Sequence, residues 1–133
     1  MRGRIAAIPL HWQNWLLSIF FLLLFPLVPL LFEWLFTGGV SSSSLQLIAS
    51  TYAITVSVSS RDMLLFGIGM LIEFIFAVFY GYSVSVSAGI HGANGAAIAA
   101  IVFVCLFHSF ERYNRHVVER APFLEFMQMR DGE

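Results

Sequence analysis

Charged residues are almost absent from two long stretches of this 133-residue sequence, and that absence constrains the fold more than any other feature. Only Glu33 interrupts residues 5–60, and only Glu73 interrupts residues 63–110. Apolar residues make up 59% of the chain and charged residues 11%, against roughly 45–50% and about 25% in soluble domains. A soluble fold of this length cannot bury so much apolar surface. The expected solvent for most of the chain is therefore lipid.

The distribution of charge is more informative than the net charge of −1, which gives no reason to expect a nucleic-acid partner. The chain has no lysine, and every arginine falls near an end of the chain or in one short hinge. These residues are Arg2, Arg4, Arg61, Arg112, Arg115, Arg120 and Arg130. Cys105 is the only cysteine, so no disulfide can form within one chain.

Apolar stretches separated by loops or charges predict four helices, at about residues 15–36, 45–60, 63–82 and 95–110. The first is long enough to cross a hydrocarbon core of about 30 Å. Prolines 26 and 29 should bend it, because each removes a backbone donor.

The helix predicted at residues 45–60 is only weakly apolar, and it leaves the number of crossings open. If it crosses, both termini and the Arg61 hinge share one side of the membrane with all seven arginines. If it does not, the arginine-bearing termini lie on opposite sides, against the positive-inside rule. We therefore expect an all-α, polytopic integral membrane protein. Its residues 1–110 form a four-helix transmembrane bundle with both termini cytoplasmic, and residues 111–133 form a charged cytoplasmic helical tail.

Serine and valine alternate in residues 54–60 and again in residues 82–89, a pattern typical of half-buried strands. The predicted helix 63–82 separates the two stretches, and open strands cannot satisfy their backbone groups in lipid. We therefore expect the first stretch to end a helix. The second is expected to be an outer loop or an extra helical turn, with a short extracellular strand as the alternative.

Glu73 is the sharpest candidate site, because an ionised carboxylate near the bilayer centre is costly. Stepping by four along its helix gives a row with Gly69, Ala77 and Gly81, which would let another helix approach closely. Two interpretations stay open. Glu73 is either a protonated carboxyl group hydrogen-bonded between helices, or an ion, proton or gating site.

Hydroxyl groups on the preceding helix are candidate partners for Glu73. The positions concerned are Ser50, Thr51, Thr55 and Ser59. Their hydroxyl groups either form hydrogen bonds between helices or line a hydrated pathway. A second small-residue row on the last helix is expected to pack helices within the chain or between subunits, and it comprises Gly92, Ala96 and Ala100.

Metal, haem and catalytic sites are not indicated. No two of the four histidines have the four-residue spacing of a helical metal site, and no serine lies in a recognisable nucleophile elbow. We expect no metal, no cofactor and no enzymatic activity.

The final segment combines a salt-bridge pattern with an amphipathic end. Glu111, Arg115 and Glu119 are four residues apart and predict that the last helix continues, with Pro122 ending it. Residues 123–129 are amphipathic and are expected along the inner membrane surface or against a partner.

Three classes of function fit these features. The favoured one is a non-enzymatic subunit or accessory protein of a homo-oligomeric or larger assembly, with lipid and other membrane subunits as its partners. The alternatives are a holin-like pore-forming protein and a small channel or transporter that uses Glu73. The expected location is a bacterial inner membrane.

Overall fold

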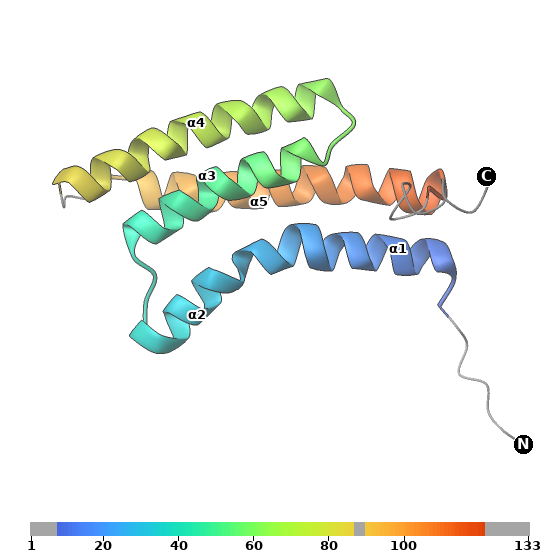
Figure 1. The fold of residues 1–133 in the computed structure, drawn as a ribbon, viewed down its shortest axis with the longest axis horizontal. Coiled ribbons are helices and arrows are strands. Elements are labelled where there is room, and N and C mark those ends of the chain that lie inside the picture. The colour runs from blue at the N-terminus through green and yellow to red at the C-terminus, as the bar shows by residue number, and fades with distance from the viewer. Residues whose placement is uncertain (1–7, 87–89, 122–133) are drawn as a thin grey trace, which may run out of the picture.

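The computed structural model describes residues 8–86 and 90–121, and every regular element in these two ranges is a helix (Figure 1). Within them, three helical stretches are long and apolar enough to cross a membrane: Leu10–Thr37, Met63–Val86 and Ala93–Val118. A further helix, α3 (Ser42–Val58), is shorter at 17 residues. The regular structure of the described residues is therefore all-helical, as expected from the sequence, and the long helices are compatible with a multi-pass membrane protein.

The first stretch is one bent helix built from consecutive segments. These are α1 (Leu10–Ser18), a π-helical segment (Ile19–Leu24), a 3-10 turn (Phe25–Leu27) and α2 (Val28–Thr37). The 3-10 turn contains Pro26, and Pro29 follows at the start of α2, so the bend falls where the prolines were expected to place it (Figure 1). The helix ends at Gly38, whose left-handed backbone (φ 74°) suits glycine.

α3 is the most buried helix of the described chain, although its composition is only weakly apolar. Its buried side chains are Gln46, Ala49, Ser50, Tyr52, Ala53, Val56 and Ser57. It packs against α4 and α5 and also touches the first helix. Because protein surrounds so much of it, α3 can hold polar side chains that a lipid-facing helix could not.

α4 (Met63–Val86) begins with a cap, since Oδ1 of Asp62 accepts a hydrogen bond from the Leu64 backbone N–H at 2.8 Å. It extends beyond the predicted residue 82 and takes in part of the second serine–valine repeat. There the hydroxyl groups of Ser83 and Ser85 donate to backbone carbonyls of the preceding turn, at 2.9 and 3.0 Å. The first repeat is helical as far as Val58, where α3 ends, and the second is helical as far as Val86, where α4 ends. Residues 87–89 lie outside the described ranges.

α5 (Ala93–Tyr113) follows Gly92, whose φ of 79° again suits glycine. A π-helical segment, Asn114–Val118, continues it. The helix thus runs past the predicted residue 110 and into the charged segment. The predicted amphipathic stretch 123–129 lies outside the described residues.

Consecutive helices run in opposite directions (Figure 1), and α3 packs against both α4 and α5. At one end of the molecule, the hydroxyl group of Ser60 in the α3–α4 turn donates to Oε1 of Glu111 on α5 at 2.9 Å. At the other end, the side-chain amide of Asn94 donates to Oγ of Ser42 at 2.9 Å, joining the starts of α5 and α3.

The end that contains Glu111 also holds the beginning of α1. The rings of Trp12 and Tyr113 meet there edge to face, with centroids 6.1 Å apart. Every arginine of the described chain lies in the α3–α4 turn, at the end of α5 or in the residues that follow α5: Arg61, Arg112, Arg115 and Arg120. We call this region the arginine end.

Gly69 marks a close approach between α4 and α3. A Cβ atom at this position would lie 1.6 Å from Oγ of Ser57 and 3.0 Å from the carbonyl oxygen of Ala53. Gly69→Ala should therefore force the two helices apart and lower the free energy of unfolding by about 1–3 kcal/mol. Denaturant-induced unfolding of the protein in detergent micelles would measure the change.

Gly67→Ala provides the matched control, because a Cβ atom at Gly67 has no neighbour within 4 Å. An equal loss of stability in both variants would contradict the packing described here. The double change Gly69→Ala with Ser57→Gly should recover part of the loss, because it removes the clashing side chain.

Candidate functional site

Glu73 is the eleventh residue of the 24-residue helix α4, and its side chain is half-buried. It lies one turn from Gly69, on the flank of the α4 face whose buried residues are Gly69, Phe76 and Ser83. Among the described residues, the Glu73 carboxyl group has no hydrogen-bond or ion-pair partner. In a hydrocarbon environment such a group is unfavourable until a partner is supplied.

The contact at Gly69 fixes the level of Glu73 along α3. Gly69 faces Ser57 and Ala53, and α4 runs antiparallel to α3 (Figure 1). One turn further along α4 therefore corresponds to about one turn back along α3. Glu73 lies level with residues 49–53 of α3.

The hydroxyl positions predicted as partners of Glu73 divide into two groups. Ser50 is buried, and Ser59 is half-buried near α5. Thr51 and Thr55 are exposed, and their hydroxyl groups donate to backbone carbonyls of their own helix at 3.0 and 2.7 Å. Within one chain the four positions do not form a single wall around Glu73.

Two further polar side chains are buried in α3. Gln46 is fully buried, and Tyr52 is 1% exposed. Neither the Gln46 amide nor the Tyr52 hydroxyl group has a hydrogen-bond partner among the described residues. Such groups raise the free energy of the folded chain, so α3 combines the deepest burial with the least complete hydrogen bonding.

The predicted rows of small residues are partly buried and partly exposed. Gly69 is buried against α3, whereas Ala77 and Gly81 are exposed on α4. On α5 the exposed members of the predicted row are Gly92 and Ala96, and Ala100 is half-buried. The residues of α5 that pack inside the chain are Ala93, Ala97, Ile101, Val104, His108 and Arg112.

Glu111 is the centre of a hydrogen-bonded network at the arginine end. Its Oε1 atom accepts hydrogen bonds from the Ser60 hydroxyl group at 2.9 Å and from the Arg61 backbone N–H at 3.0 Å. Its Oε2 atom lies 2.8 Å from Nδ1 of His108. One carboxylate thus joins the α3–α4 turn to α5.

Arg112 adds a second layer to this network and is 4% exposed. Its Nη2 group donates to the carbonyl oxygen of Ser59, and its Nε group donates to Nε2 of His108 at 3.1 Å. Because a guanidinium group can only donate, Nε2 of His108 must be unprotonated. His108 is thereby assigned as the neutral tautomer with its proton on Nδ1, facing Glu111.

A separate contact attaches α1 to the end of α5. Oγ of Ser18 lies 2.9 Å from Nε2 of His116, and both side chains are 0% exposed. Nδ1 of His116 lies 2.8 Å from the Ala121 carbonyl oxygen. That carbonyl can only accept, so His116 donates from Nδ1, and in the neutral imidazole the Ser18 hydroxyl group is then the donor to Nε2. The serine and histidine resemble a nucleophile and base in spacing, but their complete burial leaves a substrate no access.

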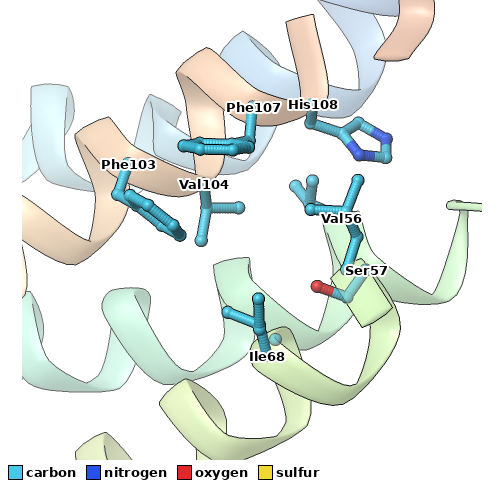
Figure 2. A pocket seen from close by; sticks show the side chains of 9 residues that line it. Val56, Ser57, Ile68, Phe103, Val104, Phe107 and His108 are labelled. Carbon is cyan, nitrogen blue, oxygen red and sulfur yellow. The ribbon is translucent and has the colours of Figure 1, made fainter. Parts of the chain in front are cut away.

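Figure 2 shows a small cleft between α3, α4 and α5, next to His108 of the Glu111 network. Its volume is about 20 Å³, room for about one water molecule. His108 and Ser57 supply polar atoms to a lining that is otherwise apolar, with Phe103 and Phe107 on one wall (Figure 2). The cleft is too small for an organic ligand.

Sequence reasoning did not identify the arginine-end network. The signal available was the spacing of His108, Glu111 and Arg112, which places three ionisable groups on one side of a helix. Their partners on the α3–α4 turn are about fifty residues away in sequence, so spacing alone could not have found them.

The described residues contain no group of three or more His, Cys, Asp or Glu side chains arranged to hold a metal ion. No protein family, curated protein or solved structure matches the chain.

Glu111→Gln should destabilise the protein, because a neutral amide is a weaker acceptor for the Ser60 and Arg61 donors and places an NH₂ group or an uncharged oxygen against Nδ1 of His108. Leaving part of a buried network unsatisfied costs about 1–3 kcal/mol. Thermal unfolding in detergent would measure the loss. Glu119→Gln is the control, because Glu119 is exposed beyond the network. A network without structural importance would give two variants of equal stability.

Proposed function

We propose that the chain is a non-enzymatic, multi-pass subunit of a membrane assembly, built from copies of itself or together with other membrane proteins. The observation that supports this most is Glu73. A half-buried carboxyl group in the middle of a long apolar helix has no partner among the described residues. In lipid such a group is stabilised by a hydrogen bond from or to another helix, and a neighbouring subunit can provide that helix.

Exposed small residues give the proposal a second line of support. Ala77 and Gly81 on α4, and Gly92 and Ala96 on α5, are exposed at the surface of the chain. Nothing lies within 4 Å of a Cβ atom built at either glycine. Such positions allow the backbone of another helix to approach closely.

The proposed topology has four crossings, with both termini in the cytoplasm of a bacterial cell. It is supported by the gathering of the described arginines at one end, which the positive-inside rule would place in the cytoplasm. The helix that fits this topology least well by composition is α3, because it is only weakly apolar. The burial of α3 among the other helices reduces the need for apolar side chains along it.

Assembly should depend on the hydrogen-bonding capacity of Glu73 and not on its charge. Glu73→Gln keeps a donor and an acceptor and should retain the native complex, whereas Glu73→Leu should lose it. Size on native gels after extraction in a mild detergent would report the difference. Phe74→Leu is the control, because Phe74 is 67% exposed at nearly the same depth.

Retention of the complex by Glu73→Leu would contradict this use of the carboxyl group. Expressing the protein in bacteria while following membrane potential tests the proposal in a second way. Abrupt depolarisation that Glu73→Leu abolishes would replace the subunit proposal with a pore.

Single cysteines in a Cys105→Ala background would test the topology. Ser41→Cys and His91→Cys should react with an impermeant maleimide in intact cells, and Asp62→Cys should react only after permeabilisation. Labelling of Asp62→Cys from outside would refute the proposed orientation.

A further inference from the structure

We propose that the partner of Glu73 is Thr51 of a second copy of this chain, with the neutral carboxyl group donating a hydrogen bond to the threonine hydroxyl oxygen. This inference rests on the proposed membrane assembly and names the contact that forms it. It is carried by the level of Glu73, by the exposure of Thr51 and by the hydrogen bond that Thr51 already makes.

Copies of one protein inserted in the same direction share the same depth in a bilayer. A polar group on one copy can therefore meet only groups at the same depth on the next. Glu73 lies level with residues 49–53 of α3, and within that segment Thr51 is the exposed residue. The other four side chains are buried inside the chain.

The other helices offer no polar side chain near this level. Residues 20–32 of the first helix and residues 96–104 of α5 are entirely apolar. Thr55, one turn from Thr51 towards the arginine end, is the next exposed hydroxyl position on α3. Thr51 is thus the exposed hydroxyl position that lies at the same depth in the bilayer as Glu73.

The existing hydrogen bond of Thr51 decides the direction of the new one. Its hydroxyl proton is donated to the carbonyl oxygen of Leu47 at 3.0 Å. The hydroxyl oxygen retains lone pairs that can accept, but it has no second proton to offer. A protonated carboxyl group can donate to it, whereas an ionised carboxylate would find no donor.

Donor and acceptor are different residues, so the contact fits two arrangements of copies. In a two-fold dimer it forms twice, with Glu73 of each copy meeting Thr51 of the partner, and in a ring it forms once at each interface. A two-fold dimer that pairs Glu73 with Glu73 is the arrangement that this inference excludes.

Cross-linking between two differently tagged copies tests the contact directly. One copy carries Glu73→Cys and the other Thr51→Cys, both in the Cys105→Ala background, and the membranes are oxidised before extraction. We expect a disulfide-linked species that carries both tags. Phe74→Cys co-expressed with Thr51→Cys is the control and should give no such species.

A second measurement guards against effects of the cysteines themselves. Thr51→Val keeps the branched shape and removes the acceptor, so it should lose the native complex, whereas Thr51→Ser should keep it. A complex that survives Thr51→Val, or cross-links only between two Glu73→Cys copies, would overturn the Thr51 contact and leave the assembly proposal standing. A wild-type protein that runs as a single copy would overturn the Thr51 contact and the assembly of copies with one another, and would leave only the part of the proposal that names other membrane proteins as partners.

Discussion

The position of α3 is the constraint on which the rest of this structure depends. A helix with so many hydroxyl, amide and phenol groups is stable among apolar helices only if protein covers most of its surface. α4, α5 and the first helix provide that cover. At Gly69 the backbone of α4 approaches α3 closely, because the absence of a side chain lets α4 pack directly against Ser57. The three longer helices thus supply the apolar exterior, and α3 shares the buried core with residues such as Leu23, Phe76 and Ile101 of the other helices.

The arginine end holds this arrangement together by a different kind of force. Packing of apolar side chains is non-directional, whereas the hydrogen bonds around Glu111 fix the α3–α4 turn against α5 in one register. Arg112 is stable at 4% exposure because the Ser59 carbonyl and His108 accept from it and Glu111 is the adjacent acid. The interaction between Ser18 and His116 adds α1 to the same end. Directional contacts therefore concentrate at one end, while the helices beyond it are held mainly by shape.

Local patterns in the sequence were sufficient for the helical class, for the places of the helices and for the bend at the prolines. They were not sufficient to predict which face of each helix is buried against its neighbours. Small residues show where a close approach is allowed, but the neighbouring helix decides which side it uses. On α4 the buried residues follow a seven-residue spacing from Gly69 to Phe76 and Ser83, not the row through Glu73. The partners of His108 and Arg112 could not be predicted either, because a turn some fifty residues away in sequence supplies them.

The bend in the first helix divides it into two parts with different attachments. Before the prolines, Ser18 and Leu23 are fully buried, whereas α2 buries none of its residues. A hollow of about 320 Å³ lies between α2 and α3, lined by Pro29, Glu33 and Ile48 among others. Beyond the prolines, the first helix is held at its far end, where Oε1 of Glu33 accepts a hydrogen bond from the Ser41 backbone N–H at 3.0 Å. The first helix is therefore fixed by buried side chains before the bend and by a polar contact with the loop after it, with the hollow between the two attachments.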